Sequence, residues 1–230
     1  MRRQIATGLG FVAIAVYLLG VPVLILWLSG NWRWVEGWIF GVLWSAVIGG
    51  SLLWLYFNDP ALFAERCRRP GTGGESRSDL AILIGIKVAS LAWLILPPLD
   101  VRFGWMPRLP VWSEVCGGIL LAAGSFFLVR AFSDNTFLSQ LVRIQTERGQ
   151  HVIDTGVYSF VRHPMYLGTA LMSVGGALLL GSAVGLLAGL GIALLLVIRI
   201  PGEEKLLAHG LQGYDAYRQK VRYRLVPRVW

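Results

Sequence analysis

The residues best suited to chemistry lie in one polar stretch that runs from His151 to Gly168. It contains two His, two Tyr, one Arg and one Asp, and it leads directly into a long apolar run. His163 precedes proline and is therefore biased away from helix, whereas Pro164 suits the first turn of the helix that follows. A helix N-terminus exposes unpaired amides that favour anionic groups. The stretch predicts a polar ligand site at the edge of an apolar helix.

We expect Tyr158, His163 and Tyr166 to line this site. A single His or Tyr at a membrane interface is usually structural. Several of them with Arg and Gly interleaved, as here, indicate ligand binding instead.

A second group of polar residues, Arg199, Glu203 and Glu204, follows the last apolar run. Arg199 and Glu203 are four residues apart, which places them on one face if a helix continues through Pro201-Gly202. They could form an interfacial ion pair of little energetic consequence. They could equally recognise a zwitterionic ligand, and the sequence leaves both possibilities open.

Several motifs of hydrolases and metalloenzymes are missing from the sequence, which has no HExxH, GxSxG, CxxC or paired catalytic carboxylates. The two cysteines, Cys67 and Cys116, indicate neither a disulfide nor a metal site. We therefore expect no metal.

The composition defines the setting for these residues. Of the 230 residues, 55% are hydrophobic and 15% are charged, and the mean hydropathy is +0.61. Soluble domains carry about a quarter charged residues, so the sequence indicates an integral membrane protein. The net charge of +8 would suggest a nucleic-acid partner in a soluble protein, but the positive-inside rule explains it without one.

The apolar runs predict an all-α integral membrane protein with about six transmembrane helices and a C-terminal amphipathic cytoplasmic segment. The expected spans are residues 5–28, 37–57, 80–99, 112–132, 165–181 and 183–200. Asp59-Pro60 should end the second span, Pro97-Pro98 should close the third, and Gly181-Ser182 should connect the last two in a tight hairpin. We divide the chain into an N-terminal region of four spans, 1–133, and a catalytic region, 134–230.

The distribution of charge orients the spans. With the N-terminus in the cytoplasm, most Lys and Arg residues fall in cytoplasmic segments, and only Arg33, Arg102 and Arg108 fall in outer loops. The positive-inside rule then predicts that both termini are cytoplasmic. Lys87 lies within the third span, where it either snorkels to the cytoplasmic face or faces a substrate.

The C-terminal segment is amphipathic, because Tyr214, Tyr217 and Val221 recur at spacings of three and four between basic residues. That pattern suits a helix on the membrane surface. It is either a plain anchor or a lid over a pocket.

Two motifs in order, separated by the predicted helical hairpin, carry a family resemblance: His151…Thr155-Gly-Val-Tyr158…Arg162-His-Pro-x-Tyr166-x-Gly168 and Arg199-x-x-x-Glu203-Glu204. Together they resemble the isoprenylcysteine carboxyl methyltransferase family, whose wider group includes membrane phospholipid N-methyltransferases. The resemblance covers roughly residues 130–230.

The resemblance implies S-adenosylmethionine as the cofactor, and a lipophilic small molecule or lipid as the acceptor, in contact with membrane lipids. It implies that these residues contact or shape the cofactor site: His151, Gly156, Tyr158, Arg162, His163, Pro164, Tyr166, Gly168 and Glu204. It implies catalytic roles for Arg199 and Glu203. Arg199 would orient the acceptor, and either Glu203 or Glu204 would bind the amino group of the cofactor. We expect the bacterial inner membrane as the location.

Three other functions stay open. They are a phospholipid N-methyltransferase, a membrane lipid reductase that uses NADPH, and a non-catalytic membrane protein that binds lipid. Saturable affinity for one cofactor or the other separates them.

Overall fold

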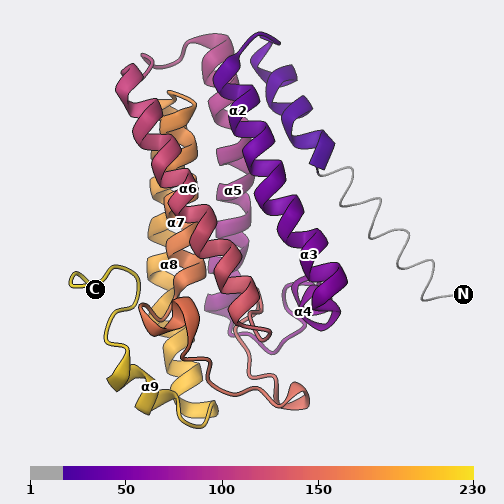
Figure 1. Ribbon diagram of the computed structural model, residues 1–230, viewed down its shortest axis with the longest axis vertical. Helices are drawn as coiled ribbons and strands as arrows, with labels where there is room; N and C mark the ends of the chain where they lie inside the picture. Colours follow the sequence, from indigo (N-terminus) through magenta and orange to yellow (C-terminus); the bar gives the residue numbers. More distant parts are fainter. Residues whose placement is uncertain (1–17) are drawn as a thin grey trace, which may run out of the picture.

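The computed structural model describes residues 18–230, and the regular elements in this part of the chain are all helices (Figure 1). An apolar helix covers Leu18–Ser29. The elements that follow are α2 (Val35–Trp44), the π-helical η1 (Ser45–Gly49), α3 (Gly50–Asn58), α4 (Pro60–Arg66), α5 (Arg77–Phe103), α6 (Val111–Asp134), the 3-10 turns η2 (Thr146–Arg148) and η3 (Gly156–Ser159), α7 (Pro164–Leu179), α8 (Ala183–Gly210) and α9 (Tyr214–Lys220).

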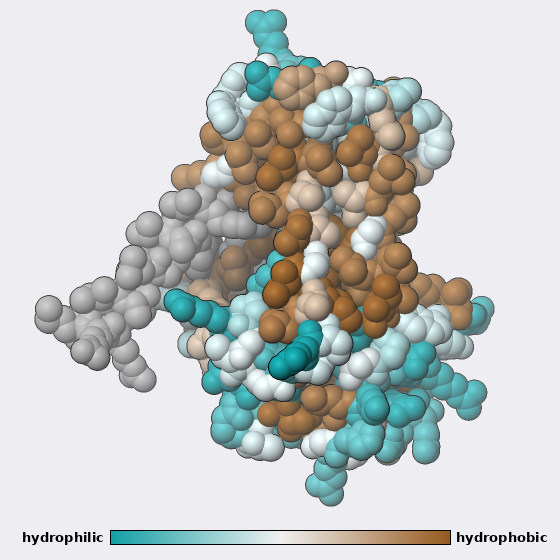
Figure 2. Space-filling view, turned by 180° about the vertical axis from the view of Figure 1, so that it is seen from behind, coloured by the Kyte–Doolittle hydropathy of each residue, from teal (hydrophilic) through white to brown (hydrophobic). Residues whose placement is uncertain are grey.

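Four helical segments are long and apolar enough to cross a membrane: Val35–Asn58, Arg77–Phe103, Val111–Asp134 and Ala183–Gly210. Leu18–Ser29 and Pro164–Leu179 are shorter apolar helices. These six segments match the expected spans and confirm an all-α, multi-pass membrane protein, although residues 5–17 of the first expected span lie outside the described residues. Figure 2 shows the apolar side chains gathered across the middle of the molecule, with polar side chains toward both ends.

Two expected helix ends were wrong. Pro97 and Pro98 do not close the third span, because α5 continues through them to Phe103. The Pro97 ring packs on Gly185 of α8, where a Cβ would lie 2.7 Å from its Cγ, so this close contact accommodates the proline within the bundle. The last span does not end near residue 200 either, since α8 passes through Pro201 and reaches Gly210.

Glycines set the closest helix contact, between α6 and α7. A Cβ on Gly124 would lie 2.7 Å from the carbonyl oxygen of Gly168, and one on Gly175 would lie 2.6 Å from the amide nitrogen of Leu121. Small residues let membrane helices approach this closely and gain dispersion energy. Gly168 and Gly175 of α7 therefore serve helix contacts within the chain.

Loops gather in two sets at opposite ends of the bundle. At one end the Leu109 amide donates to the Gly181 carbonyl, and Arg108 contacts Glu36 at 3.3 Å. At the other end lie α4, the segment between α6 and α7, and α9 (Figure 1). This second end carries the polar stretch that the sequence singled out.

Candidate functional site

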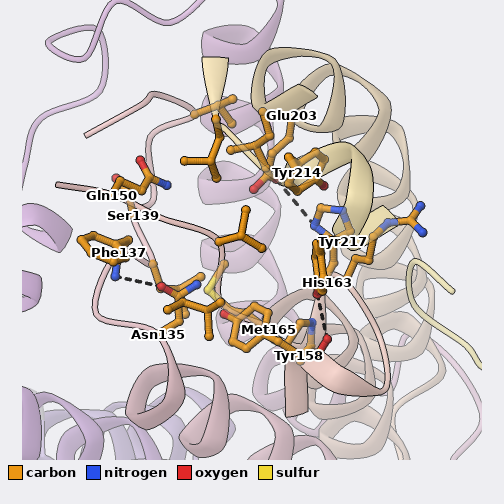
Figure 3. Close-up of a pocket in the computed structure, with 18 of the residues that line it drawn as sticks. Asn135, Phe137, Ser139, Gln150, Tyr158, His163, Met165, Glu203, Tyr214 and Tyr217 are labelled. Carbon is orange, nitrogen blue, oxygen red and sulfur yellow. Dashed lines mark hydrogen bonds and ion pairs between the residues drawn. The ribbon is translucent and has the colours of Figure 1, made fainter. Parts of the chain in front are cut away.

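A cavity lies at this second end, where α7 begins and α8 ends. Its walls come from the loop after α6, from the segment between η3 and the start of α7, and from the C-terminal part of α8 with α9 (Figure 3). The lining includes His151, Tyr158, His163, Tyr166, Glu203 and Tyr217. Residues far apart in the sequence therefore share one polar cavity.

The chain folds locally as its residue types dictate. Gly156 adopts a φ of +57°, which starts the η3 turn, and Pro164 occupies the first turn of α7. His163 has a non-helical backbone, with φ −123° and ψ 60°, and its amide donates to the carbonyl of Arg224. The adjacent Arg162 amide donates to Tyr223, so the C-terminal tail runs alongside the polar stretch.

Helix α9 covers the cavity. Tyr214 and Tyr217 are buried and line it, and the Tyr217 hydroxyl donates to the carbonyl of Tyr158 at 2.8 Å. Of the two sequence interpretations of this segment, the lid agrees with these contacts and the plain surface anchor does not.

Glu204, which lies outside the cavity lining, contacts two arginine side chains and one histidine side chain. Its Oε1 accepts from Arg162 Nε at 2.6 Å and lies 3.3 Å from His163 Nε2, while its Oε2 accepts from Arg224 Nε at 2.9 Å. Glu204 is buried, and these contacts use both of its oxygens. It therefore ties α8 to the polar stretch and to the C-terminal tail.

Glu203 points toward the cavity instead. Its Oε2 accepts a hydrogen bond from the Tyr166 hydroxyl at 2.6 Å and lies 3.9 Å from His163 Nδ1. The His163 and Tyr166 rings stack, with centroids 5.4 Å apart and planes inclined by 11°. Glu203 thus presents a carboxylate with remaining acceptor capacity beside two aromatic rings.

The Tyr158 hydroxyl is buried in the same cavity, and no partner among residues 18–230 hydrogen-bonds it. Burial raises the pKa of this hydroxyl; Asn135 opposes that shift without meeting the geometry of a hydrogen bond. A buried polar group without a partner costs free energy. It is therefore a donor available to a ligand.

Arg199 is not paired with Glu203. Although α8 is continuous across Pro201-Gly202, the Arg199 guanidinium binds Asp79 of α5 at 2.8 and 3.1 Å and the Gln140 carbonyl at 2.8 Å. Arg199 lines a neighbouring cavity rather than the one that contains Glu203. The sequence suggested either an ion pair or a joint ligand site for Arg199 and Glu203. The structure shows neither, because Arg199 is paired with Asp79.

The structure brings together most of the residues that the sequence singled out. Those that line the cavity are His151, Tyr158, Arg162, His163, Pro164, Tyr166 and Glu203. Four others do not line it. Gly156 forms a turn against Asp134, Gly168 packs on α6, and Arg199 and Glu204 are held by the ion pairs given above.

Sequence reasoning missed Arg143 in the cavity wall, together with its buried partner Glu65, which does not line the cavity. Arg143 lines the cavity and binds both oxygens of buried Glu65, at 2.8 and 2.7 Å. Ser139 also donates to Glu65. The sequence did contain one indication of this pair: Glu65 is a carboxylate in a short basic segment after the second span. A carboxylate needs a cationic partner when it is buried.

No group of three or more His, Cys, Asp or Glu side chains suited to a metal ion occurs in residues 18–230. The polar groups that line the cavity are hydroxyls, amides, two imidazoles, two guanidinium groups and one carboxylate. They form a candidate ligand site at one end of the helix bundle of a multi-pass membrane protein.

Comparison with known proteins agrees with this description. Residues 119–209 match the model of the isoprenylcysteine carboxyl methyltransferase (ICMT) family. This segment of the chain is therefore similar to that family.

The fold of the chain is similar to that of the eukaryotic intramembrane Ras methyltransferase ICMT, with a TM-score of 0.55 and 20% sequence identity. The alignment covers 94% of this chain and 75% of that one. No curated protein sequence matches this chain.

Proposed function

We propose that this membrane protein is a methyltransferase of the isoprenylcysteine carboxyl methyltransferase type, and that it transfers the methyl group of S-adenosylmethionine to the carboxylate of a lipophilic acceptor. The supporting observation is the single cavity that Tyr158, His163 and Glu203 share at the membrane face.

The donors in the cavity suit S-adenosylmethionine. The free acceptor capacity of Glu203 matches the ligand's ammonium group, and the Tyr158 hydroxyl offers a hydrogen bond that the protein does not use. The stacked rings of His163 and Tyr166 offer apolar faces at the start of α7. His151 and Arg162 complete the residues that we assign to the cofactor site.

The cavity is small in this structure, with a volume of about 100 Å³. Ligand pockets usually measure about 300–1,000 Å³. We infer that the covering elements, α9 and the C-terminal tail, move outward when the ligand enters. We assign the role of lid to the segment that holds Tyr214 and Tyr217.

When bound, S-adenosylmethionine supplies an activated methyl group, so that an acceptor oxygen forms the new C–O bond as the C–S bond breaks and its electrons stay on sulfur. A carboxylate is already ionised at pH 7, and no side chain has to remove a proton. The protein then has to exclude water and hold the two reactants in line, and such positioning contributes about 7–11 kcal/mol. The buried aromatic walls and the lid serve both requirements.

The cavity faces the cytoplasm in this proposal. Its end of the bundle carries the basic segments after α3, after α6 and after α8, and the positive-inside rule places such segments in the cytoplasm. Both termini would then be cytoplasmic. Lys87 fits this orientation, because its amine reaches Gln140 on the same side. We retain the bacterial inner membrane as the proposed location and residues 134–230 as the proposed catalytic region.

The test uses Tyr158→Phe in detergent-solubilised protein. Because the hydroxyl bonds nothing among residues 18–230, its removal should leave thermal stability unchanged. We expect calorimetry to show saturable binding of S-adenosylmethionine to the wild type and about tenfold weaker binding to the variant. Tyr223→Phe, outside the cavity lining, serves as the matched control. Binding of NADPH in place of S-adenosylmethionine would indicate a lipid reductase, and binding of neither would contradict the proposal.

A further inference from the structure

Arg66, the last residue of α4, is a cation without a carboxylate partner among residues 18–230. Its Nη1 contacts the carbonyl of Leu138 at 3.2 Å and Met165 Sδ at 3.7 Å, and its guanidinium carbon lies 4.4 Å from the centroid of the Phe132 ring. A guanidinium has five N–H donors. Most of the donors of Arg66 are therefore unused.

The nearest carboxylate in the sequence, Glu65, does not supply the missing charge. Both of its oxygens bind Arg143, and Oε2 also lies 3.4 Å from Arg68 Nε. Glu65 is thus shared by two other arginines. The positive charge of Arg66 stays uncompensated.

The surroundings of Arg66 make this charge costly. Burial lowers the pKa of its guanidinium to about 10, and the side chains that oppose this shift are Tyr158, Cys67 and Tyr166. Those three are uncharged near pH 7, so they provide no counter-ion there. Arg66 is only partly buried, yet a cation that has lost much of its contact with water favours an anionic partner.

Arg66 lies at the edge of another cavity between the helices, which has a volume of about 600 Å³ and is distinct from the one that Arg199 lines. Most of the lining is apolar, with Trp44, Phe63, Leu94, Phe132 and Ile192 among its members. Gln140 and Arg66 are polar exceptions that come from the loop end of the bundle. The cavity therefore combines a volume and walls suited to a lipid tail with one cation near its polar end.

The two cavities meet at Arg66. Leu138 and Met165, which its Nη1 contacts, both line the polar cavity, whereas Arg66 itself lines the apolar one. An anion bound by Arg66 would consequently lie next to the polar cavity, with an attached tail directed among the helices. Arg199 is less suited to this role, because Asp79 and Gln140 already occupy its guanidinium.

We propose that Arg66 determines acceptor specificity by binding the carboxylate of the lipophilic acceptor while its tail occupies the apolar cavity. This proposal rests on the proposed function and names the residue that distinguishes an anionic acceptor from a neutral one. The planar fork of arginine suits the two oxygens of a carboxylate, and a lysine offers only a point charge.

The test compares two ligands with the same tail, N-acetyl-S-farnesylcysteine and its methyl ester, titrated by calorimetry into full-length protein in detergent. We expect the wild type to bind the acid at least about tenfold more tightly than the ester. In Arg66→Gln the acid should bind no more tightly than the ester, with ester and S-adenosylmethionine affinities unchanged. Arg66→Lys should restore part of the preference, and Arg69→Gln, an exposed neighbour, should retain all of it.

A second variant tests where the tail of the acceptor binds and leaves the charge of Arg66 in place. Leu94→Trp should weaken the acid and the ester equally, since it fills the apolar cavity, and should leave S-adenosylmethionine binding unaltered. An unchanged acid-to-ester ratio in Arg66→Gln overturns the proposal. Displacement of the acid from the wild type by phosphatidylglycerol also overturns it, because Arg66 would then hold a membrane lipid. Failure of the wild type to bind S-adenosylmethionine contradicts the proposed function instead.

Discussion

The Arg199 guanidinium binds both carboxylate oxygens of Asp79, with Nε to Oδ1 at 2.8 Å and Nη2 to Oδ2 at 3.1 Å, across 120 positions of the chain. Asp79 lies in the first turn of α5, whose N-cap is Ser76, and Arg199 lies in the C-terminal half of α8. The same guanidinium donates to the Gln140 carbonyl. The pair therefore positions two helices and the loop after α6, which forms a wall of the polar cavity.

We predict that Asp79→Asn destabilises the protein by about 3 kcal/mol, because it leaves the buried Arg199 without its counter-charge. Unfolding of the detergent-solubilised protein by denaturant measures the change. The exposed pair of Asp215 and Arg218 provides the control, and Asp215→Asn should leave the free energy of unfolding within about 0.5 kcal/mol of the wild type. Equal effects of the two variants would contradict this role for Asp79.

Substitution by glutamine should affect ligand binding at Glu203 but thermal stability at the adjacent Glu204. Glu204→Gln removes the charge that holds Arg162 and Arg224, so we expect a large loss of thermal stability. Glu203→Gln keeps an acceptor for the Tyr166 hydroxyl and should melt as the wild type does, yet bind S-adenosylmethionine at least about tenfold more weakly. Thermal melts and calorimetry on both variants check this, and a destabilised Glu203→Gln that binds normally would refute it.

Glu65 gives a stability that depends on pH. Its hydrogen bonds from Arg143, opposed by burial and aided by Ser139, lower the pKa of the Glu65 carboxyl below its ordinary value of 4.5. A lowered pKa in the folded state means that the stabilisation is complete above about pH 5 and is lost as the pH falls through the lowered pKa. The difference in melting temperature between wild type and Glu65→Gln should therefore shrink toward acid pH. A difference that stays constant from pH 7 to pH 3 would exclude this linkage.

Glycine packing between α6 and α7 can be tested on a single helix. In Gly124→Ala the new Cβ would lie 2.7 Å from the Gly168 carbonyl oxygen, so the helices must separate and we expect a loss of about 1–3 kcal/mol. A Cβ on Gly118 meets no atom within 4 Å, so Gly118→Ala should be neutral or slightly stabilising. Denaturant unfolding of both variants measures the contrast, and similar values for the two would falsify the assigned contact.

Local signals predicted much of the architecture. Apolar runs located the helices because the hydrocarbon core requires about 20 apolar residues per span. Pro164 and Gly181 marked a helix start and a hairpin through backbone preferences that do not depend on distant residues. The same reasoning failed at Pro97, where α5 continues through the proline and packs against Gly185 of α8.

The polar stretch was also visible in the sequence, since Tyr158, His163 and Tyr166 are close enough along the chain to share a loop and one helical turn. Their common cavity with Glu203 required the α7–α8 hairpin, which the short Gly181-Ser182 connection predicted. The residue types and these short separations thus determined the character of the site.

The partners of the charged residues were decided only by the tertiary structure. Arg199 forms its ion pair with Asp79 and not with Glu203. Glu204 forms ion pairs with Arg162 and Arg224. Arg66 has no carboxylate partner among residues 18–230. A sequence shows how many charges there are but not how far apart they lie after folding, and Coulomb energy depends on that distance and on burial. The packing of the helices and loops sets both quantities, and so the tertiary structure decided the partner of each charge.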